Sequence, residues 1–334
     1  MREDKSEYAL EIQDLTVEYR TRGQTVYAVN GLNLKVRHRQ TLGFVGETGA
    51  GKTTTGLSIL NLLPQPAGHI THGNIFLHGK NVLEMSETQL QEMRGKEVSM
   101  IFQDPMTSLN PVLRVNLQIA EVIEKHEHIS SERAFQRAGD MLELVGIPRE
   151  RGDEYPHQFS GGMRQRVVIA MALACDPELL IADEPTTALD VTIQAQILEL
   201  MKKLRDHNNT SMLMITHDLG IVAEICDCVS IVYAGRIVEY GALADIFDHT
   251  MHPYTKGLFD SLPDMTNRQA KLKPIRGLMP DPSKLPKGCS FADRCDYAMK
   301  QCYTEAPLTF YRTEEHYVSC HLYNAENVLK GSVL

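Results

Sequence analysis

The N-terminal part of the chain carries hydrophobic side chains at nearly alternate positions. Residues 9–19 and 28–36 follow this two-residue period, which predicts strands with one buried face. Residues 41–45 (Thr-Leu-Gly-Phe-Val) form a short apolar run that predicts a buried strand. After Lys52 the apolar positions have helical spacing, which predicts a helix that ends at Pro64 and has one face formed by Leu57, Leu60 and Leu63.

Predicted strands and helices follow one another along the middle of the chain. The short apolar pattern of strands is found at residues 73–79, 179–182 and 212–215. Apolar positions three and four residues apart, typical of helices, are found from about residue 112 to 145, after Gly162, and at 193–204. Residues 229–233 and 236–240 predict a hairpin that turns at Ala234-Gly235. This mixture of elements predicts an α/β fold.

The composition of the chain changes beyond about Asp248. Regular structure is interrupted there by prolines at 253, 263, 274, 280, 282, 286 and 307. Four of the seven cysteines also lie in this part, at Cys289, Cys295, Cys302 and Cys320. Because 334 residues are many for one hydrophobic core, we expect two domains, residues 1–250 and residues 251–334.

Composition and charge exclude several classes of protein. With 43% hydrophobic and 23% charged residues, the chain has the composition of a folded globular protein. The longest apolar run, residues 167–175, is about half of the roughly 18 residues that span a bilayer. The polar N-terminus lacks the apolar segment of a secretory signal. A net charge of −9 argues against binding nucleic acid or anionic lipid by bulk electrostatics.

Residues 46–53 (Gly-Glu-Thr-Gly-Ala-Gly-Lys-Thr) match the phosphate-binding pattern G-x-x-x-x-G-K-[ST]. A predicted strand precedes them and a predicted helix follows, as this loop requires. Its glycines allow backbone N–H groups to turn toward phosphates, and the helix N-terminus adds its dipole. Lys52 is expected to contact the β- and γ-phosphates, and Thr53 to ligate Mg²⁺. The candidate nucleotide-binding residues of this segment are Gly46, Glu47, Thr48, Gly49, Ala50, Gly51, Lys52, Thr53 and Thr54.

Two further segments contain candidate functional residues. Asp183 and Glu184 end the predicted strand at 179–182, and carboxylates at strand ends face the crevice where α/β sheets bind ligands. Asp183 is expected to hold Mg²⁺, and Glu184 to polarise the attacking water as a general base. Ser160 is a good N-cap for another predicted helix, and Gly161 and Gly162 permit close backbone approach, so this helix start is a second candidate anion site.

Together these motifs resemble the ATP-binding subunits of ABC transporters. The family's motifs occur in its order: the phosphate loop at 46–53, Gln103, the signature at 160–164, the strand with carboxylates at 179–184, the D-loop at 188–190, and His217. The resemblance covers residues 9–245 and implies a P-loop NTPase core with a RecA-like sheet, an antiparallel β subdomain and a helical subdomain at about 105–165. The signature departs from the family at Met163, where Gln is usual.

The resemblance also implies roles and partners. Tyr19 is expected to stack on adenine, Gln103 to contact Mg²⁺ and sense the γ-phosphate, and His217 to bond a γ-phosphate oxygen. Residues 160–162 contact the ATP of a second ATPase subunit, commonly a paralogue, and Asp190 belongs to the nucleotide site. Two permease subunits, and indirectly an extracytoplasmic solute-binding protein, are the other partners. This predicts a peripheral ATPase on the cytoplasmic face of the cell membrane.

Residues 251–322 resemble the C-terminal region of oligopeptide and dipeptide permease ATPases, which implies peptides as the solute and leaves nickel complexes or other small solutes as alternatives. Spacers of 5, 6 and 17 residues separate the four cysteines, unlike the C-x₂-C pairs of zinc ribbons. Four thiolates suit Zn²⁺ or an iron–sulfur cluster. With the resemblance, we expect a structural 4Fe–4S cluster, with zinc or free buried thiols as alternatives. Cys175, Cys226 and Cys228 are expected to be ordinary thiols.

A soluble ABC ATPase of DNA repair or translation is the alternative from another class. Those proteins insert coiled coils or zinc modules, or carry two cassettes, whereas this chain has one compact cassette and no heptad run. No nucleic-acid partner is therefore expected. The turn-rich residues 103–111 are the expected contact with the membrane partners. The histidines at 38, 69, 72, 78 and 126 have no repeated ligand spacing and are expected to be surface residues.

Overall fold

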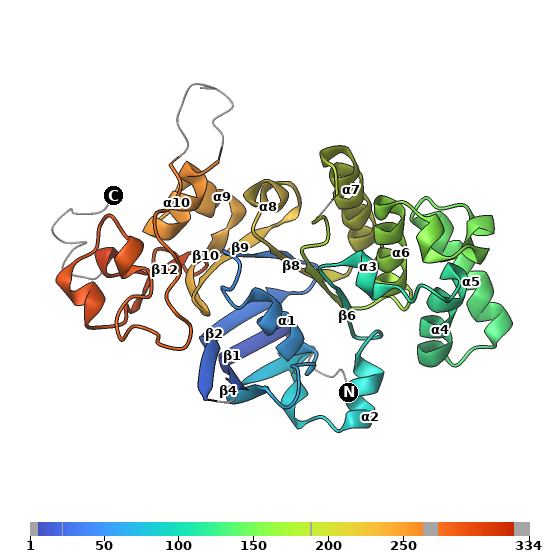
Figure 1. Ribbon diagram of the computed structural model, residues 1–334, viewed down its shortest axis with the longest axis horizontal. Coiled ribbons are helices and arrows are strands. Elements are labelled where there is room, and N and C mark those ends of the chain that lie inside the picture. Colours follow the sequence, from blue (N-terminus) through green and yellow to red (C-terminus); the bar gives the residue numbers. More distant parts are fainter. Residues whose placement is uncertain (1–5, 22, 188, 263–272, 324–334) are drawn as a thin grey trace.

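The computed structural model describes residues 6–21, 23–187, 189–262 and 273–323. Their strands form two sheets (Figure 1). The smaller sheet is antiparallel with the order β2-β1-β4-β5, and its strands are β1 (Tyr8–Thr21), β2 (Gln24–Arg37), β4 (Gly68–Leu77) and β5 (Lys80–Asn81). The larger sheet has the order β11-β12-β10-β9-β3-β8-β7-β6. Its strands are β3 (Thr41–Val45), β6 (Val98–Ile101), β7 (Leu179–Asp183), β8 (Ser211–Thr216), β9 (Cys228–Tyr233), β10 (Arg236–Ala242), β11 (Thr309–Tyr311) and β12 (Tyr317–Ser319).

The central strands of the larger sheet, from β9 through β3, β8 and β7 to β6, are parallel. Every residue of β3, β7, β8 and β9 is buried, which explains why their sequences are continuous apolar runs rather than alternating ones. Because parallel strands share one direction, the residues that follow β3, β8, β7 and β6 meet at one edge of the sheet.

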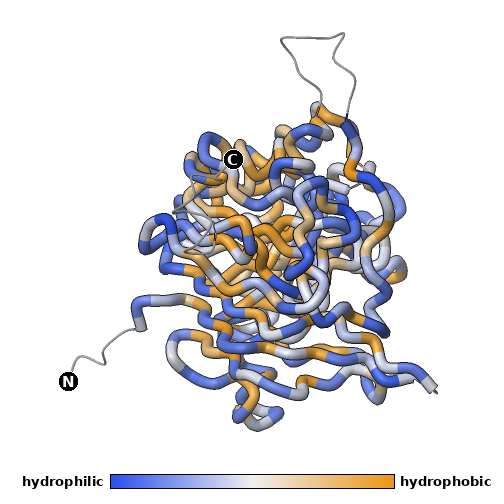
Figure 2. The backbone as a smooth tube through the Cα atoms, turned by 90° about the vertical axis from the view of Figure 1, so that its left-hand side faces the viewer, coloured by the Kyte–Doolittle hydropathy of each residue, from blue (hydrophilic) through white to orange (hydrophobic). Residues whose placement is uncertain are grey.

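Side chains of the parallel strands face two separate hydrophobic cores. On β7, Leu180 and Ala182 belong to the core shared with the helices, whereas Leu179 and Ile181 belong to the core shared with the antiparallel sheet. The same alternation occurs along β8. Figure 2 shows the hydrophobic segments gathered in the interior, between the more polar outer segments. The larger sheet is thus covered on both faces.

The helices are α1 (Lys52–Ile59), α2 (Glu87–Met93), α3 (Pro105–Ser108), α4 (Val115–Glu127), α5 (Ser131–Leu144), α6 (Gly161–Leu173), α7 (Val191–Asn208), α8 (Leu219–Ile225), α9 (Leu243–Asp248) and α10 (Pro253–Asp260). Helices α4, α5 and α6 pack on one another, on the side of the molecule away from the antiparallel sheet (Figure 1). Among the described residues, no helix has the length and apolar character needed to cross a bilayer.

The structure refines two of the predicted helices. The segment from 112 to 145 contains two helices, because α4 ends at His128 in the left-handed region (φ 51°) and Ser130 caps α5. Helix α1 ends at Ile59 rather than at Pro64, since Asn61 also has a positive φ (51°). The predicted hairpin is confirmed as β9 and β10, which turn through Ala234 and Gly235, both at positive φ.

The segment after residue 250 adds two strands to the larger sheet. Strand β12 pairs with β10, and β11 pairs with β12. Between them and α10 lie two short 3₁₀ helices, Ala292–Arg294 and Lys300–Tyr303. Figure 1 shows this segment, coloured orange to red, beside β2 and β10. In this way the C-terminal segment lies next to strand β2, where the Pro282 carbonyl oxygen accepts from the Tyr27 N–H.

Candidate nucleotide-binding and hydrolysis site

The phosphate-binding loop connects the buried strand β3 to helix α1. Two of its glycines are required by close backbone contacts. A side chain at Gly46 would bring its Cβ within 2.3 Å of the Val232 carbonyl oxygen, and one at Gly51 within 2.3 Å of the Ala28 carbonyl oxygen. Gly51 also has φ 95°, which L-residues rarely adopt. Strands β2 and β9 therefore fix the conformation of the loop from two sides.

Lys52 lies inside the loop that the sequence pattern identified. Its ammonium group donates to the carbonyl oxygens of Gly46 (2.7 Å) and Glu47 (3.0 Å). Burial lowers the pKa of Lys52, while the charges of Glu184, Asp183 and Glu47 act in the opposite direction. The cation is thus held at the position where the loop would receive phosphates.

Asp183 ends β7 at the same edge of the sheet and is 2% exposed. Burial raises the pKa of its carboxyl group, and a hydrogen bond from the Thr53 hydroxyl opposes that change. The fold thus brings together the two oxygen ligands that the sequence analysis assigned to Mg²⁺, although 130 positions separate them in the chain. Carboxylate and hydroxyl oxygens are ligands that Mg²⁺ accepts.

Glu184 is the centre of a hydrogen-bonded group formed from three different segments. Its Oε2 accepts from Gln103 Nε2, which follows β6, and from the Thr187 hydroxyl, both at 3.0 Å. Its Oε1 lies 2.9 Å from His217 Nδ1, which follows β8. Glu184 itself has φ 46°, and its N–H donates to the Ile215 carbonyl oxygen. The three residues predicted to take part in hydrolysis therefore converge.

The electrostatics of this group favour an ionised carboxylate. Burial by itself raises the pKa of Glu184, but hydrogen bonds from His217 and Thr187 and the charge of Lys52 outweigh it, so the pKa is lowered overall. An ionised carboxylate beside a phosphate-binding loop can accept a proton from water. No sequence motif points to Thr187. The only signal for it was its position three residues after Glu184 in a turn.

Tyr19 and Thr54 lie at the other side of the loop. The Tyr19 hydroxyl, on β1, is 3.3 Å from the Thr54 hydroxyl, on α1. The ring packs against the core beneath the antiparallel sheet and is partly exposed. An aromatic side chain at the start of the phosphate-binding helix is in reach of a base whose phosphates lie in the loop.

The signature residues lie away from the loop. Ser160 caps α6, with its hydroxyl accepting from the Met163 N–H (3.4 Å). Gly162 packs against Ile193 on α7, and Asp190 caps α7 by accepting from the Ile193 N–H. Figure 1 shows α6 beside α7 and separated from α1. Within one chain, then, Ser160 and Gly162 do not join the phosphate loop. Ala188, in the predicted D-loop, is outside the described residues.

The four tail cysteines line one small pocket, together with His252, Pro253, Phe291, Ala292, Tyr297, His321 and Leu322. Burial raises the pKa of the Cys295 thiol to about 11 and that of Cys320 to about 12. Cys302 Sγ accepts the Met299 N–H at 3.4 Å. Backbone N–H groups near Cys289, Cys295 and Cys320 act to lower the pKa of these thiols, against the larger effect of burial. Cys175, Cys226 and Cys228 are buried elsewhere, as free thiols.

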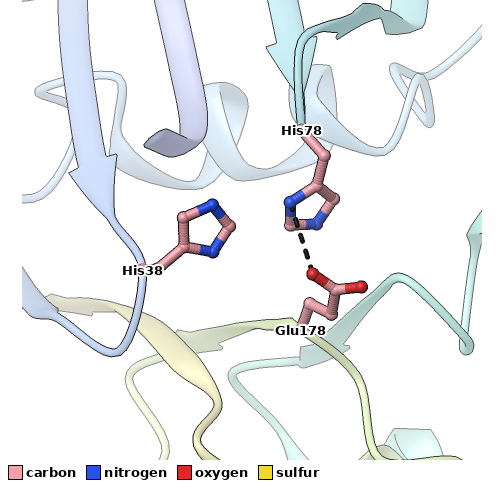
Figure 3. Close-up of side chains that lie close together, drawn as sticks. All are labelled: His38, His78 and Glu178. Atoms are coloured by element: carbon pink, nitrogen blue, oxygen red, sulfur yellow. Dashed lines mark ion pairs between the residues drawn. The ribbon is translucent and has the colours of Figure 1, made fainter. Parts of the chain in front are cut away.

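Two of the histidines that were expected to be surface residues meet in the fold. His38 follows β2, His78 follows β4, and Glu178 precedes β7 (Figure 3). The imidazole rings are stacked with centroids 5.4 Å apart, and His78 Nδ1 lies 3.5 Å from Glu178 Oε2. In the described part of the chain, only this group brings three nitrogen, sulfur or carboxylate ligand atoms within 4.8 Å of one another. Because the Glu178 side chain is 57% exposed, we assign the group no role beyond joining the two sheets.

Comparisons with known proteins agree with this geometry. A family model described as ABC transporter matches residues 29–187, and one described as oligopeptide/dipeptide transporter, C-terminal region, matches residues 238–302. The oligopeptide transport ATP-binding protein OppD of Bacillus subtilis is 52% identical over 316 residues, covering 94% of this chain and 88% of that protein. The dipeptide transport ATP-binding protein DppD of the same organism is 48% identical, with 95% of each chain covered.

Solved structures give the same fold. The ATP-binding cassette MJ0796, in a dimeric post-hydrolysis state bound to ADP and phosphate, matches with a TM-score of 0.63 and 25% identity. That match covers 70% of this chain and 98% of the cassette. Because the curated relatives span nearly the whole chain at about half identity, the chain belongs to the ABC transporter family, as an ATP-hydrolysing subunit of the oligopeptide/dipeptide transporter type.

Proposed function

We propose that Glu184 activates the water that attacks the γ-phosphate of ATP. Its ionised carboxylate, held by Gln103, Thr187 and His217, supports this role, and this group is the observation that carries the proposal. The loop amides and Lys52 bind the phosphates. Thr53, Asp183 and Gln103 hold Mg²⁺, which offsets the negative charge of the phosphates.

We further propose that ATP is bound between two ATPase subunits. The separation of the α6 start from the phosphate loop supports this, because a capped helix N-terminus with two glycines is an anion site that has no partner loop in its own chain. Residues 160–162 of each chain then face the loop of the other. The second subunit is a paralogue or a further copy of this chain. Residues 1–250 form the nucleotide-binding domain, with the helical subdomain at about 105–165, and residues 251–334 form the C-terminal domain.

The transported solute in this proposal is a peptide. The relatives are named for oligopeptide and dipeptide transport, and this chain matches them through its C-terminal region as well as its ATPase core. Import proceeds through two permease subunits at the cytoplasmic face of the membrane, with solute delivered to them by an external binding protein. A nickel complex or another small solute is the alternative cargo.

Two observations support a metal centre at Cys289, Cys295, Cys302 and Cys320. The four thiols line one pocket, and Cys302 Sγ accepts the Met299 N–H. Hydrogen bonds to sulfur stabilise thiolate ligands. Both a 4Fe–4S cluster and a single zinc accept four cysteines, and the cluster is the centre proposed, with zinc as the alternative.

The test of the transport function uses the whole complex. Co-purification should yield this chain with two membrane subunits and a second ATPase. In vesicles, ATP hydrolysis should rise when the external binding protein carries a peptide, and labelled peptide should accumulate. Stimulation by a nickel complex but not by peptides would instead assign the alternative cargo. A chain that purifies with nucleic acid and no membrane subunit would overturn the proposal.

A further inference from the structure

The phosphate-binding loop contains a carboxylate, Glu47, which is the wrong charge for a site that receives a triphosphate. This side chain is 30% exposed, and its charge is one of those that act on buried Lys52. Like charges at short range in a partly buried site repel each other strongly, and solvent screens them only in part. A loop with this residue therefore requires a compensating cation.

That cation comes from the C-terminal segment, 247 positions along the chain. Arg294 Nη1 donates to Glu47 Oε2 at 2.9 Å, and the Arg294 side chain is only 6% exposed. The guanidinium is fixed from three other sides. Its Nε donates to the Arg276 carbonyl oxygen (2.9 Å), Nη1 also donates to the Tyr233 hydroxyl (3.3 Å), and the group lies 5.9 Å from the Phe291 ring centroid. Arg294 is held in place independently of Glu47.

The same segment contacts the loop and its neighbours at other points. The buried Tyr254 hydroxyl accepts the Glu47 backbone N–H at 3.0 Å. Any side chain at Gly49 would meet the Met279 methyl group. The Pro282 carbonyl oxygen accepts from the Tyr27 N–H on β2 (2.9 Å). The C-terminal segment thus forms one wall of the phosphate-binding loop.

We propose that Arg294 is a positioning and charge-compensating residue of the ATP site, which neutralises Glu47 so that the loop accepts the phosphates of MgATP. This rests on the proposal that residues 46–53 bind those phosphates. Arg294 ends the short helix Ala292–Arg294, directly before Cys295. The fold of the cysteine pocket therefore sets the position of the compensating charge, and nucleotide affinity depends on a segment outside the ATPase motifs.

The test measures the equilibrium affinity for MgATP in wild type, Arg294→Met, Glu47→Gln and the double variant. Arg294→Met leaves the Glu47 carboxylate unpaired, so its affinity should fall roughly tenfold. The double variant removes both charges and should recover most of that loss. Glu47→Gln alone leaves the cation uncompensated and should bind MgATP a few times more tightly. The loss in Arg294→Met should shrink at high salt, because screening weakens the repulsion.

A purely structural role for the ion pair makes a different prediction. In that case the double variant would bind MgATP as weakly as Arg294→Met, and salt would leave the loss unchanged. Either result, or wild-type affinity in Arg294→Met, overturns the proposal. Arg294→Lys keeps the charge and should bind better than Arg294→Met. If the methionine variant unfolds, Glu47→Gln remains decisive, because an affinity no higher than that of wild type would overturn the proposal. Lys52→Ala separates the two proposals, since wild-type affinity in that variant would refute the loop assignment itself.

Discussion

His217 Nδ1 lies 2.9 Å from Glu184 Oε1, at the ends of the neighbouring strands β8 and β7. The histidine side chain is 58% exposed, whereas that of the glutamate is 10% exposed. The pair therefore links a buried carboxylate to a residue that faces the solvent side of the site. His217→Ala should lower ATP turnover about a hundredfold, because the base loses the group that orients it. Affinity for MgATP, measured by calorimetry, should change far less than turnover. An equal loss in both would contradict an orienting role.

The pKa of Glu184 gives a prediction on pH. Its pKa in the folded chain is lowered from 4.5, since hydrogen bonds from His217 and Thr187 outweigh the effect of burial. The stabilising contacts of the carboxylate are therefore complete above pH 4.5 and are lost as the pH falls through the lower, folded value. Thr187→Val removes one donor, so the pKa should rise. The acid limb of the pH–rate profile should then move to higher pH, although His217, the other partner of Glu184, is unchanged. An unshifted limb would show that Thr187 does not act on the base.

Gly51 provides a test of the loop geometry with a matched control. Gly51→Ala combines a positive φ with a Cβ 2.3 Å from the Ala28 carbonyl oxygen, whereas Gly23→Ala has the same sign of φ (93°) and nothing within 4 Å. Both substitutions incur the conformational cost, about 1 kcal/mol. Only Gly51→Ala adds the steric conflict, so it should lose about 1–3 kcal/mol more in the free energy of unfolding. Equal losses in chemical denaturation would mean that the loop relaxes around the new side chain.

The cysteine pocket predicts the outcome of metal removal. Protein purified without oxygen should be brown and contain iron and sulfide, and Cys302→Ser should lose both together with part of its thermal stability. Cys175→Ser is the matched control, since Cys175 is also buried but lies outside the pocket. Its iron content should equal that of wild type. A colourless protein with one tightly bound zinc per chain would contradict the iron–sulfur cluster and support a zinc site instead.

Sequence patterns predicted the parts of the molecule in which neighbouring residues act together. The loop at 46–53, the strand ending in Asp183 and Glu184, and the hairpin at Ala234-Gly235 each have a local signature that the fold retains. The end of α1 differed from the prediction because Asn61 takes a positive φ, which no apolar period reveals.

Contacts between distant segments had no such signature. Arg294 and Glu47 are 247 positions apart, and a single arginine near a cysteine is usually a surface residue. His38 and His78 looked isolated along the chain, yet they follow β2 and β4, whose ends both pair with the start of β1, and their rings stack. Thr187 resembled an ordinary turn residue until the position of the Glu184 side chain was known. These relationships follow from the way the two sheets and the C-terminal segment pack, which no local pattern encodes.

The most direct test of the central claim is single-turnover ATP hydrolysis by the assembled complex carrying Glu184→Gln. The amide keeps the size of the side chain and one acceptor oxygen but cannot act as a base. We predict that the variant binds MgATP with about wild-type affinity and hydrolyses it at least a hundredfold more slowly, so that ATP remains bound and uncleaved. Hydrolysis at close to the wild-type rate would contradict the assignment of Glu184 as the catalytic base.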